Sequence, residues 1–264
     1  SAGLSFDNNN TPYIYYDGEK GNVIKFSEGK WVKVGEPFSK GEALSIKLSF
    51  DNTNNPWVAY GDSENDIKST VKKYSLGKWN NIGSGLPATS EPIYLSHDFE
   101  FPLLMTKTAN FGVDPIQTYQ LVNNKWTLKS KGESVISSHF LDVLVLNGNE
   151  IYLAYADKQT DYKLTVKKFI KNEWILVGKN GITEGECRAI SIEKNENNLL
   201  TVVCYDNGSK SVVKIEWTGT TWKRLDSKYQ YRSDLVSRSS TSNNNVSYIM
   251  FSNKEKSQLL KLDK

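Results

Sequence analysis

Short runs of apolar residues alternate with turn residues along the whole chain. Between residues 41 and 83, four such runs follow one another, at 43–50, 57–60, 70–74 and 79–82. The runs are rich in Val, Ile, Leu, Tyr and Trp, and Asn, Asp, Gly and Pro lie between them. This pattern is typical of short β-strands joined by turns. We therefore predict four strands in this segment.

A tryptophan begins the fourth run of the segment and recurs at nearly constant spacing. It stands at the same place of the pattern five times, in steps of 47 or 48 residues: Trp31, Trp79, Trp126, Trp174 and Trp222. A period of roughly 40 to 50 residues that holds four strands is the size of one β-propeller blade. The spacing thus indicates an array of one repeated unit.

The second run of each unit is apolar on both of its faces. In the second unit, Val58 and Tyr60 lie on one face, and Trp57 and Ala59 lie on the other. A strand that is apolar on both faces is covered on both sides, and in a propeller the two neighbouring blades cover it. An immunoglobulin-like sandwich would alternate apolar with polar residues, and an open solenoid would need polar capping repeats at its ends.

These features predict an all-β, six-bladed β-propeller of four-stranded repeats, each about 48 residues long, in a single domain over residues 1–264. The chain ends after the third run of the sixth unit. The last blade is therefore expected to lack its outer strand and to pack face to face on the first blade. A five-bladed ring with an accessory segment is the main alternative, because only five tryptophan strands occur.

The repeat resembles one found in secreted propeller proteins. In the second unit its phrase stands as DNTNNPWVAY at 51–60, VKKY at 71–74 and WNNIG at 79–83. The resemblance covers nearly all of the chain and fails mainly in the third unit. It implies a propeller fold and an extracellular location, for arrays that mostly have no assigned activity. A looser similarity to propeller lectins implies sugar sites between the tryptophan-bearing repeats.

Charge and hydropathy exclude some classes of function. The chain has 33 Lys and Arg against 30 Asp and Glu, a net charge of +3, and the lysines are spread over every repeat. No patch for nucleic acid or for a membrane surface follows from that balance. No apolar run approaches the roughly 18 residues of a membrane span, and the N-terminus lacks the regions of a signal peptide. We expect no nucleic-acid partner and no membrane insertion.

Two sets of repeated residues allow either a structural or a binding role. Aspartates after the second run could hold a cation or sugar hydroxyls, although Asp is also a common turn former. They are Asp17, Asp62, Asp157 and Asp206. The repeated tryptophans could stack on sugar rings, but one residue per unit at one register favours packing between outer strands. We predict the structural role for both sets.

The third unit departs from the repeat, because Thr106 and Lys107 stand where other units keep Tyr and Asp. Lost local consistency often marks a functional site. We predict one polar, ligand-binding pocket at the junction of the third and fourth blades, lined by His97, Asp98, Lys107 and Asp142. The two histidines of the chain are too few for a metal site of three or four ligands. We expect neither a metal nor another cofactor.

The chain has two cysteines, and repeat matching aligns Cys187 with Ala43 and Cys204 with Ala59. These positions lie on adjacent antiparallel strands, so we predict a disulfide between Cys187 and Cys204. In the loop-entropy account, such a bond would contribute roughly 3 kcal/mol. Two buried thiols are the alternative.

The function that these features favour is carbohydrate binding by a lectin-like, extracellular and monomeric module. Its partner would be a glycan or another extracellular protein. A glycan-active enzyme, either a lyase or a hydrolase, is the competing class, and a ligand-free scaffold within a larger secreted protein is the third.

Sequence features disfavour the hydrolase but leave the question of an enzyme open. Glycoside hydrolysis needs two carboxylates across a cleft, and propeller sialidases also need arginines gathered from several blades. The arginines of this chain all lie in its last third: Arg188, Arg224, Arg232 and Arg238.

Overall fold

The structure is a computed structural model that describes most of the chain. The described residues are 2–97, 102–108, 114–130, 134–135, 140–146, 150–195 and 197–225, together with the backbone of 236–241, 247–252 and 257–262. The chain forms two compact units, Ser1–Ser134 and Val135–Lys264. The single domain over residues 1–264 stays a prediction.

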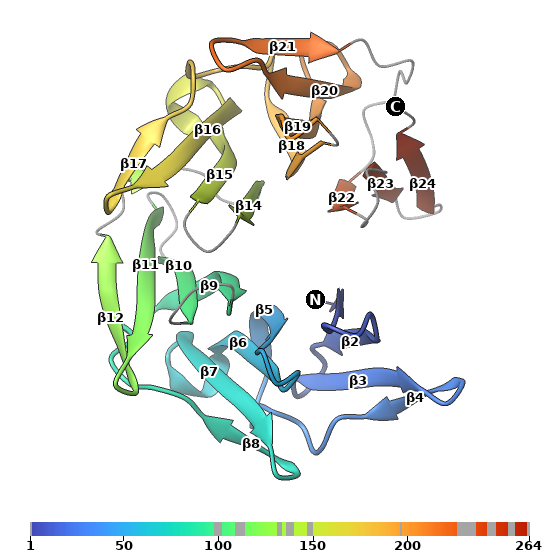
Figure 1. Ribbon diagram of the computed structural model, residues 1–264, viewed down its shortest axis with the longest axis vertical. Helices are drawn as coiled ribbons and strands as arrows, with labels where there is room; N and C mark the ends of the chain where they lie inside the picture. Colours follow the sequence, from blue (N-terminus) through green and yellow to red (C-terminus); the bar gives the residue numbers. More distant parts are fainter. Residues whose placement is uncertain are drawn as a thin grey trace. The chain divides into compact units, whose positions relative to one another are not determined.

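The first unit contains three antiparallel sheets in which the strands pair in chain order (Figure 1). The first sheet consists of β1 (Ala2–Phe6), β2 (Pro12–Tyr16), β3 (Asn22–Ser27) and β4 (Lys30–Lys33). The second consists of β5 (Ala43–Phe50), β6 (Pro56–Asp62), β7 (Lys68–Ser75) and β8 (Lys78–Asn81). The third consists of β9 (Ser90–Ser96), β10 (Leu103–Thr108), β11 (Asp114–Val122) and β12 (Lys125–Ser130), with the short β13 (Ser134–Val135) paired to β11.

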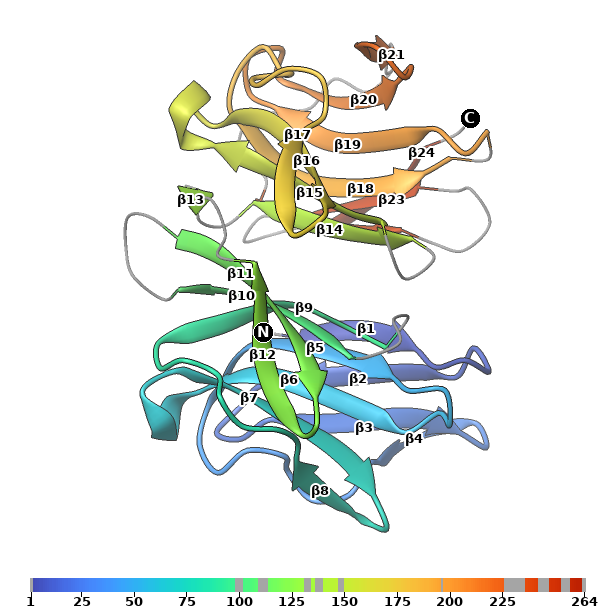
Figure 2. The same ribbon diagram turned by 60° about the vertical axis from the view of Figure 1, so that its left-hand side comes forward.

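The second unit repeats this arrangement, and Figure 2 shows its strands β18, β19 and β20 side by side. One sheet consists of β14 (Leu141–Leu146), β15 (Glu150–Asp157), β16 (Lys163–Ile170) and β17 (Glu173–Leu176). The next consists of β18 (Cys187–Lys194), β19 (Leu200–Asp206), β20 (Ser211–Trp217) and β21 (Trp222–Leu225). The last consists of β22 (Val236–Thr241), β23 (Ser247–Ser252) and β24 (Ser257–Leu262).

The sheet topology corrects the prediction of a six-bladed propeller. In the described residues, the four-strand path of a blade occurs in five sheets, and the outer strand of each carries one of the repeated tryptophans. The remaining described sheet, β22–β24, has three strands, and none of them carries a tryptophan. The fold is an all-β five-bladed propeller with four antiparallel strands per blade, and β22–β24 form an accessory sheet.

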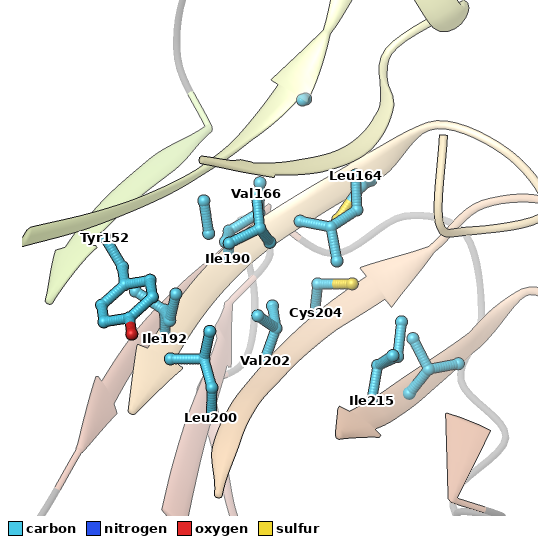
Figure 3. Packing of buried hydrophobic residues seen from close by; sticks show 13 residues of the cluster. Tyr152, Leu164, Val166, Ile190, Ile192, Leu200, Val202, Cys204 and Ile215 are labelled. Carbon is cyan, nitrogen blue, oxygen red and sulfur yellow. The ribbon is translucent and has the colours of Figure 1, made fainter. Parts of the chain in front are cut away.

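Within each unit, neighbouring sheets pack through apolar faces. In β6, Val58 belongs to a core shared with the first sheet, whereas Ala59 belongs to a core shared with the third. This confirms that the second strand of a blade is covered on both sides. In the second unit, the side chains of Val166 from β16 and Ile190, Val202 and Cys204 from β18 and β19 point toward one another (Figure 3).

The repeated tryptophans join the outer strands of neighbouring blades. Three of them donate their indole N–H to a backbone carbonyl at the end of the preceding outer strand. The bonds are Trp79 Nε1 to Val34 O at 3.1 Å, Trp126 Nε1 to Ile82 O at 3.0 Å and Trp222 Nε1 to Val177 O at 2.7 Å. The predicted structural role of the tryptophans is therefore confirmed for these three residues.

Helical structure is scarce in the described residues, where it consists of the 3-10 turns η1 (Ser63–Asn65) and η2 (Lys158–Thr160). Each turn connects the second and third strands of its blade. The described part of the chain contains no helix with the length and hydropathy needed to cross a membrane.

Candidate functional site

A cleft of about 210 Å³ opens in the first unit where β8 leads into β9. It lies between the start of β7, the connection after β8 and the tryptophan of β12. The lining residues are Asn65, Lys68, Ser69, Thr70, Val71, Asn81, Ile82, Gly83, Ser84, Gly85, Leu86 and Trp126. They come from the second sheet and its turn η1, from the connection between β8 and β9, and from β12 of the third sheet.

One hydroxyl fixes each of three connections between blades to the third strand of the preceding blade. Ser39 Oγ accepts the backbone N–H of Gly21 at 2.6 Å, and Thr183 Oγ1 accepts that of Leu164 at 3.0 Å. At the cleft, Ser90 Oγ accepts the N–H of Ser69 at 3.3 Å. Ser39, Ser90 and Thr183 therefore occupy equivalent positions in the three connections.

The residue before the hydroxyl-bearing residue explains why the junction of the second and third sheets is open. In the first connection it is Phe38, which is 1% exposed and packs on Tyr60 and Trp79. In the second unit it is Ile182, which packs on the core. At the cleft it is Thr89, whose side chain is exposed. The connection is also longer there, since Ser90 follows Gly83 by seven positions and Ser39 follows Gly35 by four. Phe38 and Ile182 fill the other two junctions, whereas Thr89 does not fill this one.

The cleft combines exposed hydrogen-bonding groups with an apolar wall. Asn65, Asn81 and Ser84 are exposed, whereas Leu86 and Trp126 are buried. None of the residues that line the cleft carries a carboxylate. This arrangement can form hydrogen bonds with hydroxyl groups and pack against a carbon skeleton, but its lining has no pair of acids for general acid and base catalysis.

Backbone hydrogen bonds hold the rim of the cleft in place. The N–H of Gly83 donates to Asn124 Oδ1 at 3.0 Å, and the N–H of Trp126 donates to Ser84 O at 2.8 Å. The indole N–H of Trp126 is already bonded to Ile82. The tryptophan therefore supports the wall of the cleft through its fixed position, and the exposed amides and hydroxyl are left for a ligand.

The structure places His97 and Lys107 among residues of their own unit. His97 Nδ1 lies 2.9 Å from Ser49 Oγ of β5, and its ring packs edge-on to Trp57 at 4.3 Å between centroids. Lys107 Nζ lies 3.6 Å from Glu91 Oε2, which also accepts a hydrogen bond from Ser45. Both predicted site residues thus contact polar groups of the second and third sheets.

Asp142 belongs to the second unit, where its Oδ2 accepts the backbone N–H of Ile192 at 2.9 Å. Asp98 lies outside the described residues. The shared pocket of these four residues stays a prediction.

Three of the four aspartates, Asp62, Asp157 and Asp206, form turns as predicted, and the role of Asp17 stays a prediction. Asp62 and Asp157 cap the two 3-10 turns, where they accept the N–H of Glu64 and of Gln159. Asp206 accepts the N–H groups of Gly185 and Gly208 at 2.9 and 3.0 Å. These carboxylates satisfy backbone donors of nearby loops, which is the usual reason for Asp in a turn.

The two cysteines are buried free thiols in the structure, so the predicted disulfide is not confirmed. Burial raises the pKa of the Cys187 thiol, and a hydrogen bond with Cys204 adds to the increase. The predicted alignment of Cys204 with Ala59 is wrong. Cys187 pairs with Asp206 as Ala43 pairs with Asp62, and Cys204 therefore takes the place of Tyr60, two residues before the Asp.

Sequence reasoning did not single out the residues of the cleft. It named the grooves between blades only in general, through the similarity to propeller lectins. The usable signal was the connection 83–90, which is longer than its counterparts and has Thr89 where Phe38 and Ile182 stand. The difference can be recognised only when Ser39, Ser90 and Thr183 are known to occupy equivalent positions, which their hydrogen bonds show.

Comparison with known proteins gives a fold likeness without a sequence family. No family model and no curated protein sequence matches the chain. Among solved structures, the SapL1 lectin in complex with alpha methyl fucoside matches with a TM-score of 0.62 and 14% identity, over 98% of this chain and 91% of that one.

Two further structures show the same likeness. A mutant of the Aleuria aurantia lectin in complex with Fucα1-6GlcNAc matches with a TM-score of 0.58 and 13% identity, over 99% of this chain and 91% of that one. The GH93 alpha-L-arabinofuranosidase of Fusarium graminearum, in complex with arabinobiose, matches with a TM-score of 0.57 and 13% identity, over 95% and 87%. At such low identity, the comparisons show that this chain has a propeller fold.

Proposed function

We propose that this protein is a carbohydrate-binding, lectin-like module and that the cleft between β7, β8 and β12 holds the sugar. The protein acts outside the cell, as the resemblance of its repeat to secreted propeller proteins implies. Its partner is a free glycan or a glycan carried by another extracellular protein.

The observation that carries the proposal is the lining of the cleft. Sugars present hydroxyl groups at their edges and C–H groups on their faces, so their sites combine a few placed polar groups with apolar walls. Asn65, Asn81 and Ser84 supply amides and a hydroxyl, and Leu86 and Trp126 supply the wall. The rim is fixed by backbone hydrogen bonds, which reduces the ordering cost of binding.

A glycan-active enzyme remains the alternative, because one of the similar structures is an arabinofuranosidase. The lining of the cleft supports binding over hydrolysis, since none of its residues is an acid. Glycosidases of the usual kind use two carboxylates on opposite sides of the bond that is cut. Release of a chromogenic leaving group from aryl glycosides would support the alternative.

The first experiment fills the cleft. A glycan array identifies a bound glycan, and titration calorimetry then measures its affinity for the wild type and for Ser84→Trp. The indole at position 84 would occupy the space of the ligand, so we expect the affinity to fall at least about tenfold, the effect of losing one charge-assisted or two neutral hydrogen bonds.

The matched control is Glu36→Trp. Glu36 follows Gly35 as Ser84 follows Gly83, and both side chains are exposed. We expect this variant to bind like the wild type, and both variants to melt close to it. Unchanged affinity in a folded Ser84→Trp protein would place the sugar elsewhere, and an array without any binder would contradict the function itself.

A further inference from the structure

Lys68 is the cationic residue among those that line the cleft. It begins β7 and is half-buried. The described part of the chain gives Lys68 no ion pair, although Asp62 lies directly opposite it in the pairing of β6 and β7. The Asp62 carboxylate instead accepts the N–H of Glu64 at 3.2 Å in the 3-10 turn.

Other half-buried lysines of the same blade are held by groups of the protein. Lys73 Nζ lies 2.7 Å from Asp51 Oδ2, and Lys72 Nζ donates to Phe38 O at 2.6 Å. In the fourth blade, Lys168 takes the place of Lys73, and its Nζ lies 2.6 Å from Glu150 Oε1. Lys68 differs from these residues because it lines a cleft in which no lining residue is an acid.

A second cation borders the same space. The side chain of Lys125 runs past Gly85, whose added Cβ would lie 3.5 Å from Lys125 Cγ and Cε. Gly85 lines the cleft and Lys125 is exposed. The carboxylates of the neighbouring turn, Glu64 and Asp66, are exposed and do not line the cleft. The charged groups that line or border the cleft, Lys68 and Lys125, therefore favour an anion.

We propose that the cleft takes an acidic saccharide whose carboxylate or sulfate pairs with Lys68, with Lys125 at its edge. This inference rests on the proposed function and specifies the class of its ligand. A half-buried ammonium group gains most from an anion that replaces its lost hydration. The neutral amides and hydroxyl of the cleft then bind the remaining hydroxyl groups of the sugar.

The test compares sugars that differ only in charge. Methyl glucuronide is compared with methyl glucoside, and galactose 6-sulfate with galactose, by titration calorimetry at low and high salt. We expect the acidic member of at least one pair to bind about tenfold more tightly at low salt, and the difference to shrink as salt screens the charges. The pair that shows it tells whether a carboxylate or a sulfate is preferred.

Lys68→Gln should remove this preference, whereas Lys68→Arg should retain it. The matched control is Lys163→Gln, because Lys163 lies opposite Asp157 in β15 and β16 as Lys68 lies opposite Asp62. We expect this control to bind like the wild type.

The outcomes separate the two proposals. If sugars bind and Ser84→Trp blocks them, but charge, salt and Lys68→Gln make no difference, the acidic ligand is wrong and the sugar site stands. If Ser84→Trp does not affect binding of any of these sugars, the cleft is not the site and both proposals fail. A preference for acidic sugars that Lys68→Gln does not alter also overturns the role of Lys68.

Discussion

At the scale of single residues, the glycine after each outer strand is fixed by two constraints. Gly35, Gly83 and Gly178 all have positive φ angles, of 69°, 72° and 79°. Each also lies against an aromatic side chain of the next blade. A Cβ at position 83 would lie 2.6 Å from Trp126 Nε1, and one at position 178 would lie 2.6 Å from Trp217. The glycine of the Trp-x-x-Val/Ile-Gly sequence is therefore required for the close contact between the outer strands of neighbouring blades.

Gly83→Ala should therefore destabilise the protein more than strain alone explains. The positive φ costs about 1 kcal/mol for an alanine, and the clash with Trp126 adds about 1 to 3 kcal/mol. The control is Gly77→Ala, because Gly77 has a φ of 79° but nothing within 4 Å of an added Cβ. Urea denaturation measures both variants, and equal losses of stability would contradict the packing role of Gly83.

At the scale of elements, a carboxylate or amide organises the turn between the first two strands of a blade. Asp51 Oδ1 accepts the N–H groups of Thr53 and Asn55 at 3.0 and 2.9 Å. Asp7 does the same in the first blade, and Asn195 does so in the last complete blade. Asp7 and Asp51 therefore organise these turns, and the turn fixes the register of the hairpin.

Asp51 also connects its turn to two other strands. Its Oδ2 accepts the indole N–H of Trp57 at 3.0 Å and lies 2.7 Å from Lys73 Nζ. Burial by itself would raise the pKa of Asp51, but the hydrogen bonds from Lys73, Trp57, Asn55 and Thr53 outweigh burial and hold the pKa well below its usual range. The ionised carboxylate therefore stabilises the folded state.

This depressed pKa predicts a loss of stability in acid. The contribution of Asp51 is fully present above the pKa of an unfolded aspartate, about 3.9, and is lost as the pH falls further toward the folded value. Asp51→Asn should lower the free energy of unfolding by about 2 kcal/mol at pH 7 and by much less near pH 2.

Urea denaturation at pH 7 and near pH 2 measures this prediction. Asp161→Asn serves as the control, because Asp161 is exposed and occupies a left-handed position that Asn tolerates. We expect the control to keep the stability and acid response of the wild type. If Asp51→Asn lowered the free energy of unfolding equally at pH 7 and near pH 2, the charge of Asp51 would not contribute to stability.

At the scale of the whole molecule, the first blade has an apolar face that its own unit leaves exposed. Leu4 pairs with Ile14 as Leu48 pairs with Val58, yet Leu4 is 58% exposed and Leu48 is 9% exposed. Phe6 and Trp31 are exposed on the same blade. The counterpart of this face in the second blade is covered, because it forms a core with the first blade.

If a second copy of the chain covers this face, Leu4→Lys should destabilise the protein by more than about 2 kcal/mol, since a charged group would then be buried against that copy. The control is Leu76→Lys, at a hairpin tip that is 98% exposed, which should change stability by less than about 0.5 kcal/mol. Thermal denaturation compares the two variants. Equal stability would mean that the face stays open to solvent, and size-exclusion chromatography would show whether a second copy covers it.

The sequence by itself determined the strands, the repeat and the anchors between blades. Apolar alternation, turn residues and the tryptophan spacing are local signals, and strands and turns depend mainly on such signals. The role of Asp62 in a turn and of Trp79 between outer strands could also be predicted, because each recurs in several units at one position. Repetition supplied the evidence that a single unit does not give.

The tertiary structure decided what the repeat left open. The number of complete blades depends on which strands pair, and the last repeat has no tryptophan strand to pair. The register of Cys204 depends on the pairing of Cys187 with Asp206, which repeat counting did not anticipate.

The position of the cleft likewise depends on packing. It arises because Thr89 points to solvent where Phe38 fills the first junction, and the alignment of these two residues follows from hydrogen bonds to Gly21 and Ser69. Contacts between residues far apart in the chain set these features, and no local sequence pattern encodes them.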